Sequence, residues 1–279
     1  MSDILIDRGF ARLAEGLLHY RSAGSEGSVP LVMLHASPAS SKSLEPLAVS
    51  IAAKRRVILP DTPGNGLSCP PADAQPSLTS YASMLDTLCD TLGHPQIDLY
   101  GTHTGAHIAI EWAIAHPRRV RRIVLDGVAI LAPEQRAEFL ALYAPPRVPD
   151  SSGTQFPWAW NLIRDQMIFW PHYRKDTAHL RQGGQFEPRL LHDLTMDLLG
   201  ALDSYHQPYE AVFRHDVLAR LPLVTHKTLW LHGEHGPLDS NAEAAFALMP
   251  AAEAVAARDT PDKAATINAF LAEEDKQCG

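Results

Sequence analysis

The chain has 279 residues, of which 46% are hydrophobic, and a formal net charge of −8 at pH 7. This acidic balance gives no electrostatic reason to expect nucleic acid or an anionic membrane as a partner. The three cysteines (Cys69, Cys89 and Cys278) are too few and too scattered for a disulfide framework or a thiolate metal site. Neither a signal-peptide pattern nor a run of about 18 apolar residues is found, so we expect a cytoplasmic protein.

Short apolar runs rich in β-branched residues alternate with longer helical patterns along most of the sequence. The predicted strands, in chain order, are residues 16–21, 30–35, 56–60, 97–100, 122–126, 227–232 and 252–256. The predicted helices are residues 43–53, 79–92, 106–115, 241–248 and 261–274. This alternation predicts an α/β fold with a mostly parallel sheet covered by helices.

The alternation breaks between residues 131 and 221, a stretch that contains three tryptophans, Trp158 among them. A helical insertion over one end of the sheet explains this better than a second independent domain. We therefore predict a core of residues 1–130 and 222–279 with a helical cap at 131–221. Such a cap would roof a substrate pocket and exclude water from it. We expect Trp158 to line that pocket or to pack the cap, and a helical layer without a pocket is the alternative.

Three segments carry the strongest signals. Residues 30–40 (PLVMLHASPAS) form an apolar strand that breaks into a loop of small residues, and residues 57–68 (VILPDTPGNGLS) end a strand in a Pro/Gly turn. Residues 98–106 (DLYGTHTGA) run from a strand through a tight turn with two glycines into a helix. In this order the segments resemble the oxyanion loop, the D-x-P-G-x-G-x-S element and the G-x-S-x-G nucleophile elbow of the α/β-hydrolase family. The resemblance covers almost the whole chain and implies that family's twisted sheet, flanked by helices.

In the elbow-like segment, His103 stands where the family has serine. The two glycines of the turn remove side chains where a strand must bend sharply into a helix. Because a helix start leaves backbone N–H groups unpaired, the N–H of Thr104 and that of Ala36 or Ser37 could hold a developing oxyanion. The resemblance therefore implies a site in which His103 faces an oxyanion hole.

The rest of the family's catalytic triad is missing. The usual acid position aligns with Gly236, the final histidine is His235, and no Gly-His pair precedes the last predicted helix. An ordinary serine triad is therefore excluded. We predict that Asp126, at the end of the strand after the elbow, stabilises the His103 imidazolium; the alternative is that Asp126 only caps its own turn. Weaker candidates for this role are Glu234, His235 and Asp239.

Other polar residues near these motifs have structural interpretations. His35 either makes hydrogen bonds within the oxyanion-like loop or contacts substrate, Asp61 fixes its own Pro/Gly turn, and His107 is peripheral to the site. Of the 14 histidines, only His35, His103 and His235 could converge, and no spacing resembles a known metal site. We therefore predict neither a metal nor a cofactor.

These observations predict an enzyme that hydrolyses an ester, lactone or thioester of a small molecule with an apolar or aromatic part. His103 would activate water or attack the acyl carbon directly. Two alternatives stay open because fold does not decide chemistry: a cofactor-independent lyase with His103 as base, and a non-catalytic ligand-binding protein. We expect no nucleic-acid or membrane partner, and either a monomer or a homodimer.

Overall fold

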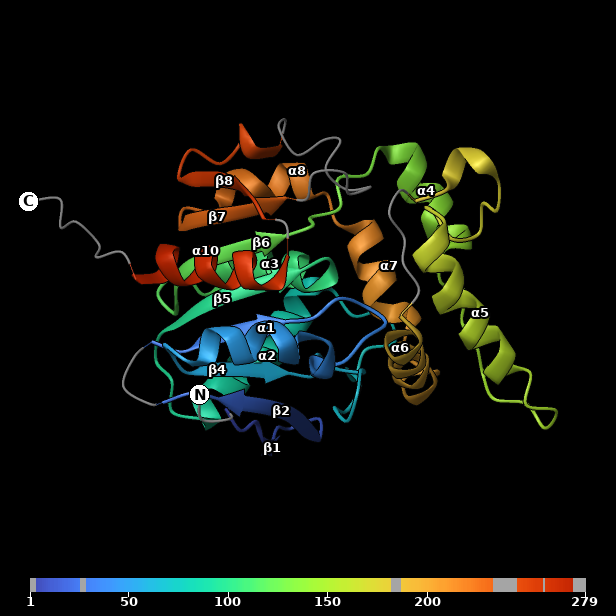
Figure 1. Cartoon of the computed structure of the whole chain (residues 1–279), viewed down its shortest axis with the longest axis horizontal. Coiled ribbons are helices and arrows are strands. Elements are labelled where there is room, and N and C mark those ends of the chain that lie inside the picture. The colour runs from blue at the N-terminus through green and yellow to red at the C-terminus, as the bar shows by residue number, and fades with distance from the viewer. Residues whose placement is uncertain (1–3, 26–28, 182–186, 233–244, 258, 273–279) are drawn as a thin grey trace, which may run out of the picture.

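The structure is a computed structural model that describes residues 4–25, 29–181, 187–232, 245–257 and 259–272. Within these residues an eight-stranded sheet has the order β1-β2-β4-β3-β5-β6-β7-β8 (Figure 1). β2 pairs antiparallel with β1 and β4, and the neighbours from β4 to β8 pair in parallel. The predicted α/β class with a mostly parallel sheet is confirmed.

The strands are β1 (Asp7–Arg12), β2 (Leu17–Ala23), β3 (Leu31–Leu34), β4 (Val57–Pro60), β5 (Ile97–Thr102), β6 (Val120–Asp126), β7 (Lys227–His232) and β8 (Ala252–Ala256). The helices around the sheet are α1 (Glu45–Ala52), α2 (Leu78–Thr91), α3 (Thr104–Ala115) and α10 (Thr260–Ala272). Short 3₁₀ turns occupy Ser41–Leu44, Thr177–His179 and Leu221–Leu223. The first half of the predicted helix at 241–248, residues 241–244, lies outside the described residues.

The sheet is buried on both faces because successive side chains of a strand point to opposite sides. In β3, Val32 packs into the core cluster that also contains residues of α2 and α3, whereas Met33 packs into the cluster with residues of α1 and α10. Leu99 and Tyr100 divide in the same way on β5. Two apolar layers therefore hold β3 and β5 rigidly in the middle of the sheet.

The interval between β6 and β7 is helical. Its helices are α4 (Pro133–Leu142), α5 (Gln155–Ile168), α6 (Pro188–Gly200), α7 (His206–Arg214) and α8 (Val217–Arg220). Figure 1 shows α4 to α7 together beyond one end of the sheet, and we call these four helices the helical layer. Phe139 of α4 and Phe213 of α7 hold it together by ring contacts with Tyr143 and Trp170.

The strand β1 was not predicted. Its sequence DRGFAR has one large apolar residue, Phe10, and the exposed fraction of that side chain is 53%. The strand forms by pairing with β2 from Asp7↔Ser22 to Arg12↔Leu17. The sequence of β1 itself has no apolar pattern that predicts this pairing. Among the described helices, none is long and apolar enough to cross a membrane.

Candidate active site

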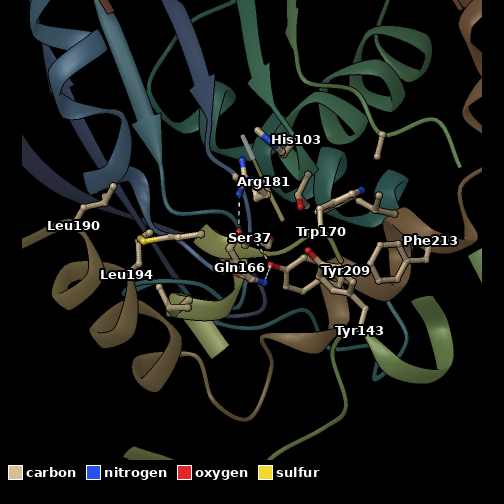
Figure 2. A pocket seen from close by; sticks show the side chains of 16 residues that line it. Ser37, His103, Tyr143, Gln166, Trp170, Arg181, Leu190, Leu194, Tyr209 and Phe213 are labelled. Atoms are coloured by element: carbon tan, nitrogen blue, oxygen red, sulfur yellow. Dashed lines mark hydrogen bonds between the residues drawn. The ribbon is translucent and has the colours of Figure 1, made fainter. Parts of the chain in front are cut away.

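A cavity of about 470 Å³ lies where the loops after β3 and β5 meet the helical layer. The core supplies Ala36, Ser37, His103, Thr104 and Ala129 to its wall. Figure 2 shows aromatic side chains gathered on one side of the cavity and aliphatic ones on the other. The helical layer and its connections supply Tyr143, Ile163, Gln166, Met167, Trp170, Arg181, Leu190, Leu194, Tyr209, Val212 and Phe213.

His103 forms the turn between β5 and α3. Its φ is 51°, the one positive value of a non-glycine residue among those described. This backbone conformation is strained for a residue with a Cβ, and such strain is found at functional turns. The backbone N–H of His103 donates to the Asp126 carbonyl (2.9 Å), which fixes the turn to the end of β6. The His103 side chain is exposed and lines the cavity, with Nδ1 2.9 Å from Thr102 Oγ1.

The glycines of this turn are required by close backbone contacts. A Cβ on Gly101 would lie 2.3 Å from the Gly105 carbonyl oxygen, and a Cβ on Gly105 would lie 2.3 Å from the Leu34 carbonyl oxygen. Both distances are far below van der Waals contact. The glycine requirement inferred from the sequence is therefore confirmed, and it brings α3 close to β3.

Three residues whose backbone N–H groups were predicted to bind an oxyanion line the cavity together with His103. Thr104 is the first residue of α3, where a helix leaves its N–H groups unpaired. Ala36 and Ser37 follow β3. In the part of the chain that the structure describes, none of these three N–H groups donates to a protein acceptor. The predicted donors therefore converge on one cavity with His103.

The loop after β3 is fixed from the helical layer by residues that the sequence did not identify. The Tyr209 hydroxyl donates to the Ser37 carbonyl (2.6 Å), and Gln166 Nε2 donates to the Tyr209 hydroxyl (3.1 Å). Burial raises the pKa of Tyr209 well above its usual value, so the hydroxyl keeps its proton. This contact holds the Ser37 peptide in position at the cavity.

His35 and Trp158 are not among the residues that line the cavity. His35 is fully buried; its Nδ1 lies 2.8 Å from the Ala36 carbonyl oxygen, and its Nε2 accepts from the Thr62 N–H (3.0 Å). The ring therefore joins the loops after β3 and β4. Trp158 packs its ring against Tyr205 within the helical layer. His235, Glu234 and Asp239 lie outside the described residues.

Asp126 lies at the end of β6, directly opposite Thr102 in the register with β5. Its carboxylate accepts hydrogen bonds from the Tyr100 hydroxyl and from Lys263 Nζ of α10, both at 2.7 Å. The negative charge of Asp126 is therefore partly neutralised by a neighbouring cation. Its role as the partner of His103 stays a prediction.

Asp61 fixes the turn after β4. Its carboxylate accepts from the Leu67 N–H (2.9 Å) and pairs with His19 Nδ1 at 2.8 Å. A Cβ on Gly66 would lie 2.1 Å from Asp61 Oδ2, so the turn closes tightly around the carboxylate. These contacts agree with the interpretation of Asp61 as a structural residue. Within the described residues, no group of three or more His, Cys, Asp or Glu side chains is arranged to hold a metal ion.

Three buried histidines should make the stability of the fold pH-dependent. Burial lowers the pKa of His35, His107 and His172 below the usual value of 6.5. Below pH 6.5 the unfolded chain therefore binds protons that the folded protein does not, and stability falls as the pH falls. We expect the free energy of unfolding to drop between pH 7 and pH 5, by up to about 1.4 kcal/mol per pH unit for each histidine.

Urea denaturation at pH 7.5, 6.5 and 5.5 measures this slope. His192→Gln is the control, because the His192 side chain is exposed on α6 and the slope should be unchanged. A free energy of unfolding that is constant across this range would contradict the prediction.

Comparison with known proteins places this geometry in context. Residues 29–163 match the family model described as alpha/beta hydrolase fold. Among curated relatives, the 2-hydroxy-6-oxononadienedioate/2-hydroxy-6-oxononatrienedioate hydrolase 2 of Pseudomonas putida is 40% identical over 129 residues, 42% of this chain and 44% of the relative. A 2-hydroxymuconate semialdehyde hydrolase of a Pseudomonas species is 40% identical over 118 residues, 40% of this chain and 39% of the relative. The chain thus matches less than half the length of these relatives.

Solved structures match along almost the whole chain. A hydrolase from Pseudomonas aeruginosa has a TM-score of 0.72 at 20% identity and covers 96% of this chain and 99% of its own. The enol-lactonase from Burkholderia xenovorans has a TM-score of 0.70 at 19% identity and covers 95% of this chain and 100% of its own. At these identities the likeness shows the fold.

Proposed function

We propose that this chain is a member of the α/β-hydrolase superfamily, and an enzyme that hydrolyses a small carbonyl compound in the cavity beside His103. The observation that carries the proposal is a cavity of about 470 Å³ that is lined both by an exposed imidazole and by three residues whose backbone N–H groups have no acceptor within the described part of the chain. The strand-turn-helix at residues 97–115 acts as the nucleophile elbow, with His103 in place of serine. Its relatives are named as hydrolases of carbonyl compounds, which supports this reaction class.

His103 acts as the base in this proposal. If Nδ1–H donates to Thr102 Oγ1, Nε2 is left unprotonated and can remove a proton from water. The hydroxide that forms attacks the carbonyl carbon, and the C–O or C–C bond to the leaving group then breaks. The leaving group takes the proton from the imidazolium, so His103 returns to its neutral form. Direct attack by Nε2 on an acyl carbon, followed by hydrolysis of the acyl-imidazole, is the covalent version of the same reaction.

The oxyanion hole consists of the Thr104 N–H and the N–H of Ala36 or Ser37. Negative charge develops on the carbonyl oxygen only as water attacks, so fixed donors stabilise the transition state more than the ground state. The N-terminus of α3 adds a partial positive charge at the same place. Asp126 would stabilise the imidazolium from the end of β6, although Lys263 offsets part of its charge.

The helical layer acts as a cap in this proposal. It supplies most of the cavity wall, which excludes water from the reacting groups and strengthens their electrostatic interactions. The wall is largely aromatic and aliphatic, so the substrate carries an apolar part. Arg181, on the segment after α5, adds a fixed positive charge at this wall and is held by donation from Nη1 to the Gln166 carbonyl (2.7 Å). Figure 2 shows Arg181 and His103 among the side chains that line this cavity.

We propose a substrate that also carries a carboxylate, bound by Arg181. The names of the relatives support this, because a 2-hydroxy-6-oxononadienedioate has carboxylates and a carbonyl on one unsaturated chain. A carboxylate at Arg181 would place the other end of such a molecule among the apolar side chains. The experiment that tests the function is a turnover screen of 2-hydroxy-6-oxo dienoates, lactones and phenyl esters with the purified protein. No turnover of any of these classes would contradict the proposal.

Arg181→Gln should raise KM for a carboxylate substrate by about 10- to 100-fold, because a hydrogen bond between charged groups contributes about 1.5–3 kcal/mol. The kcat value should change much less, since Arg181 would bind the carboxylate equally in the ground and transition states. Steady-state kinetics with a dienoate and with an uncharged phenyl ester measures both. The phenyl ester should show little change in KM.

Arg189→Gln is the matched control for this substitution. Arg189 is an exposed arginine of α6 that pairs with Asp193 and does not line the cavity. Its KM should equal that of the wild type for both substrates. An equal rise of KM in both variants, or none in Arg181→Gln, would show that Arg181 does not bind the carboxylate.

A further inference from the structure

Two histidines and a glutamate form a line of hydrogen bonds behind the His103 turn. His107 Nδ1 lies 2.9 Å from His215 Nδ1, and His215 Nε2 lies 2.9 Å from Glu111 Oε1. Arg220 donates to both oxygens of Glu111, at 2.8 and 2.9 Å. We call His107, His215 and Glu111 the histidine bridge. His107 and Glu111 are buried, and the exposed fraction of the His215 side chain is 8%. These contacts are therefore not transient surface pairs.

The neighbouring donors fix where each proton of the bridge lies. The Ala129 N–H donates to His107 Nε2 at 3.1 Å, so that nitrogen carries no hydrogen. His107 must then be protonated at Nδ1 and donate to His215 Nδ1, which has to accept. His215 is consequently protonated at Nε2 and donates to the Glu111 carboxylate. One arrangement satisfies every contact, and in it both imidazoles are neutral.

The charges around the bridge support this arrangement. Burial alone would raise the pKa of Glu111, but donation from His215 and Arg220 lowers it to about 2, so the carboxylate stays ionised. Burial, together with His215 and His103, lowers the pKa of His107 well below its usual range. On the side of the neighbouring helix α2, the Thr79 hydroxyl donates to Glu111 Oε2 at 3.4 Å.

The bridge joins the parts of the protein that surround the proposed catalytic group. His107 and Glu111 are on α3, one and two turns after His103, and His215 caps the end of α7. Residues of α7 line the cavity. Ala129 also lines it, and the backbone N–H of Ala129 donates to His107 Nε2. A Cβ on Gly127 would lie 3.2 Å from the His103 ring, so Gly127, two residues before Ala129, packs closely on that imidazole.

We propose that the histidine bridge is a pH-dependent positioning device, which holds segment 127–129 and the end of α7 in place around His103 only while both its imidazoles are neutral. The inference rests on the proposed function, because it assigns these residues to the same site. An added proton on either imidazole cannot be accommodated in this line of hydrogen bonds. It places two N–H groups against each other either between His107 Nδ1 and His215 Nδ1 or between His107 Nε2 and the Ala129 N–H.

Solvent can deliver that proton at the outer end of the bridge. A hollow of about 300 Å³ is lined by His215, Glu111, Arg214 and Arg220. Two positive side chains and one negative side chain, Glu111, therefore lie at the outer end of the bridge. Acidification should therefore break the Ala129 contact before the protein unfolds, and turnover should fall reversibly on the acid side.

Nitrogen-15 NMR of the histidine rings in the full-length protein tests the arrangement without any substrate. At pH 7.5 we expect His107 as the Nδ1–H tautomer and His215 as the Nε2–H tautomer. On acidification, hydrogen exchange of the Ala129 amide, corrected for its intrinsic rate, should accelerate by about fivefold or more as the bridge takes up a proton. The reverse tautomers, or an Ala129 amide whose protection does not change with pH, would overturn the proposal.

Two substitutions of His215 separate positioning from general packing. His215→Phe keeps the ring but cannot accept from His107, and it should accelerate Ala129 exchange by about fivefold or more at pH 7.5. His215→Asn keeps an acceptor near Nδ1 but cannot be protonated. It should retain Ala129 protection and weaken its pH dependence, because only His107 can then take up the added proton. His116→Phe, at the far end of α3, is the control and should behave as wild type in both respects.

Measurements of activity would separate this inference from the proposed function. With a phenyl ester as probe, His215→Phe should lower kcat by about tenfold with a smaller change in KM. His215→Asn should make the acid limb of the kcat profile less steep, because protonation of the base His103 still lowers turnover but protonation of His215 no longer does. Equal acid limbs in wild type and His215→Asn would overturn the inference while leaving hydrolysis intact. A wild type without turnover but with the expected tautomers and exchange would instead contradict the proposed function alone.

Discussion

His103→Ala is expected to lower kcat/KM for every accepted substrate by about 100- to 10,000-fold, the usual contribution of a positioned general base. The side chain lines the same cavity as Thr104 and the helical layer, and the proposal places the carbonyl carbon within its reach when the Thr104 N–H holds the carbonyl oxygen. The backbone donors survive the substitution. A residual rate above that of the uncatalysed reaction should therefore remain.

His103→Gln distinguishes chemistry from folding in this experiment. Glutamine fills similar space and forms hydrogen bonds, but it cannot take up a proton near neutral pH. It should therefore be as inactive as His103→Ala while retaining the wild-type circular dichroism and unfolding midpoint. Wild-type turnover in both variants would mean that His103 takes no part in the reaction.

Gly105→Ala is expected to lower the free energy of unfolding by about 3 kcal/mol or more, because overpacking against rigid backbone is at the costly end of its range. The added Cβ would lie 2.3 Å from the Leu34 carbonyl oxygen and 2.8 Å from that of His35. Both are backbone atoms next to the central strand β3 and cannot rotate away. α3 would have to move off the sheet, which also displaces the Thr104 N–H and should reduce activity in the remaining folded protein.

Gly200→Ala is the matched control for the glycine substitution. No heavy atom lies within 4 Å of the Cβ it would add at the end of α6. Its stability should be unchanged or higher by up to about 1 kcal/mol, because alanine loses less conformational freedom in a helix than glycine. Chemical denaturation of the two variants beside the wild type gives the comparison. Equal stability of Gly105→Ala and the wild type would mean that α3 is not held at β3 as described.

The sequence predicted the centre of the fold and the core side of the site because short-range sterics determine them. The continuous apolar run at residues 123–125 is typical of a strand buried on both faces, and it lies in β6. The glycines of the His103 turn have no other explanation than close backbone contact. Once this turn is identified, His103, Thr104 and the loop after β3 must lie at one edge of the sheet.

The cap side of the site could not be predicted, because tertiary packing of amphipathic helices decides which face meets the cavity. Trp158 was expected either to line the cavity or to pack among the helices, and it packs on Tyr205. Tyr209 and Arg181, which were not singled out, line the cavity. Polar side chains on helices have no periodic signal that separates a cavity wall from a solvated surface.

His107 was interpreted as peripheral, and the structure places it fully buried and hydrogen-bonded at both ring nitrogens. A signal for it was present in the sequence. His103, His107 and Glu111 recur at intervals of four, which places them on one face of a helix. The partner, His215, is distant in the chain, and only the folded structure brings it to His107.

The measurement that tests hydrolysis through His103 most directly is turnover of a 2-hydroxy-6-oxo dienoate in oxygen-18 water, with wild type and His103→Ala in parallel. Wild type should yield an acid fragment that carries one oxygen-18 atom, and His103→Ala should yield almost none of it over the same time. Carbonyl fragments without label from the wild type, or labelled acid formed equally fast by His103→Ala, would contradict it.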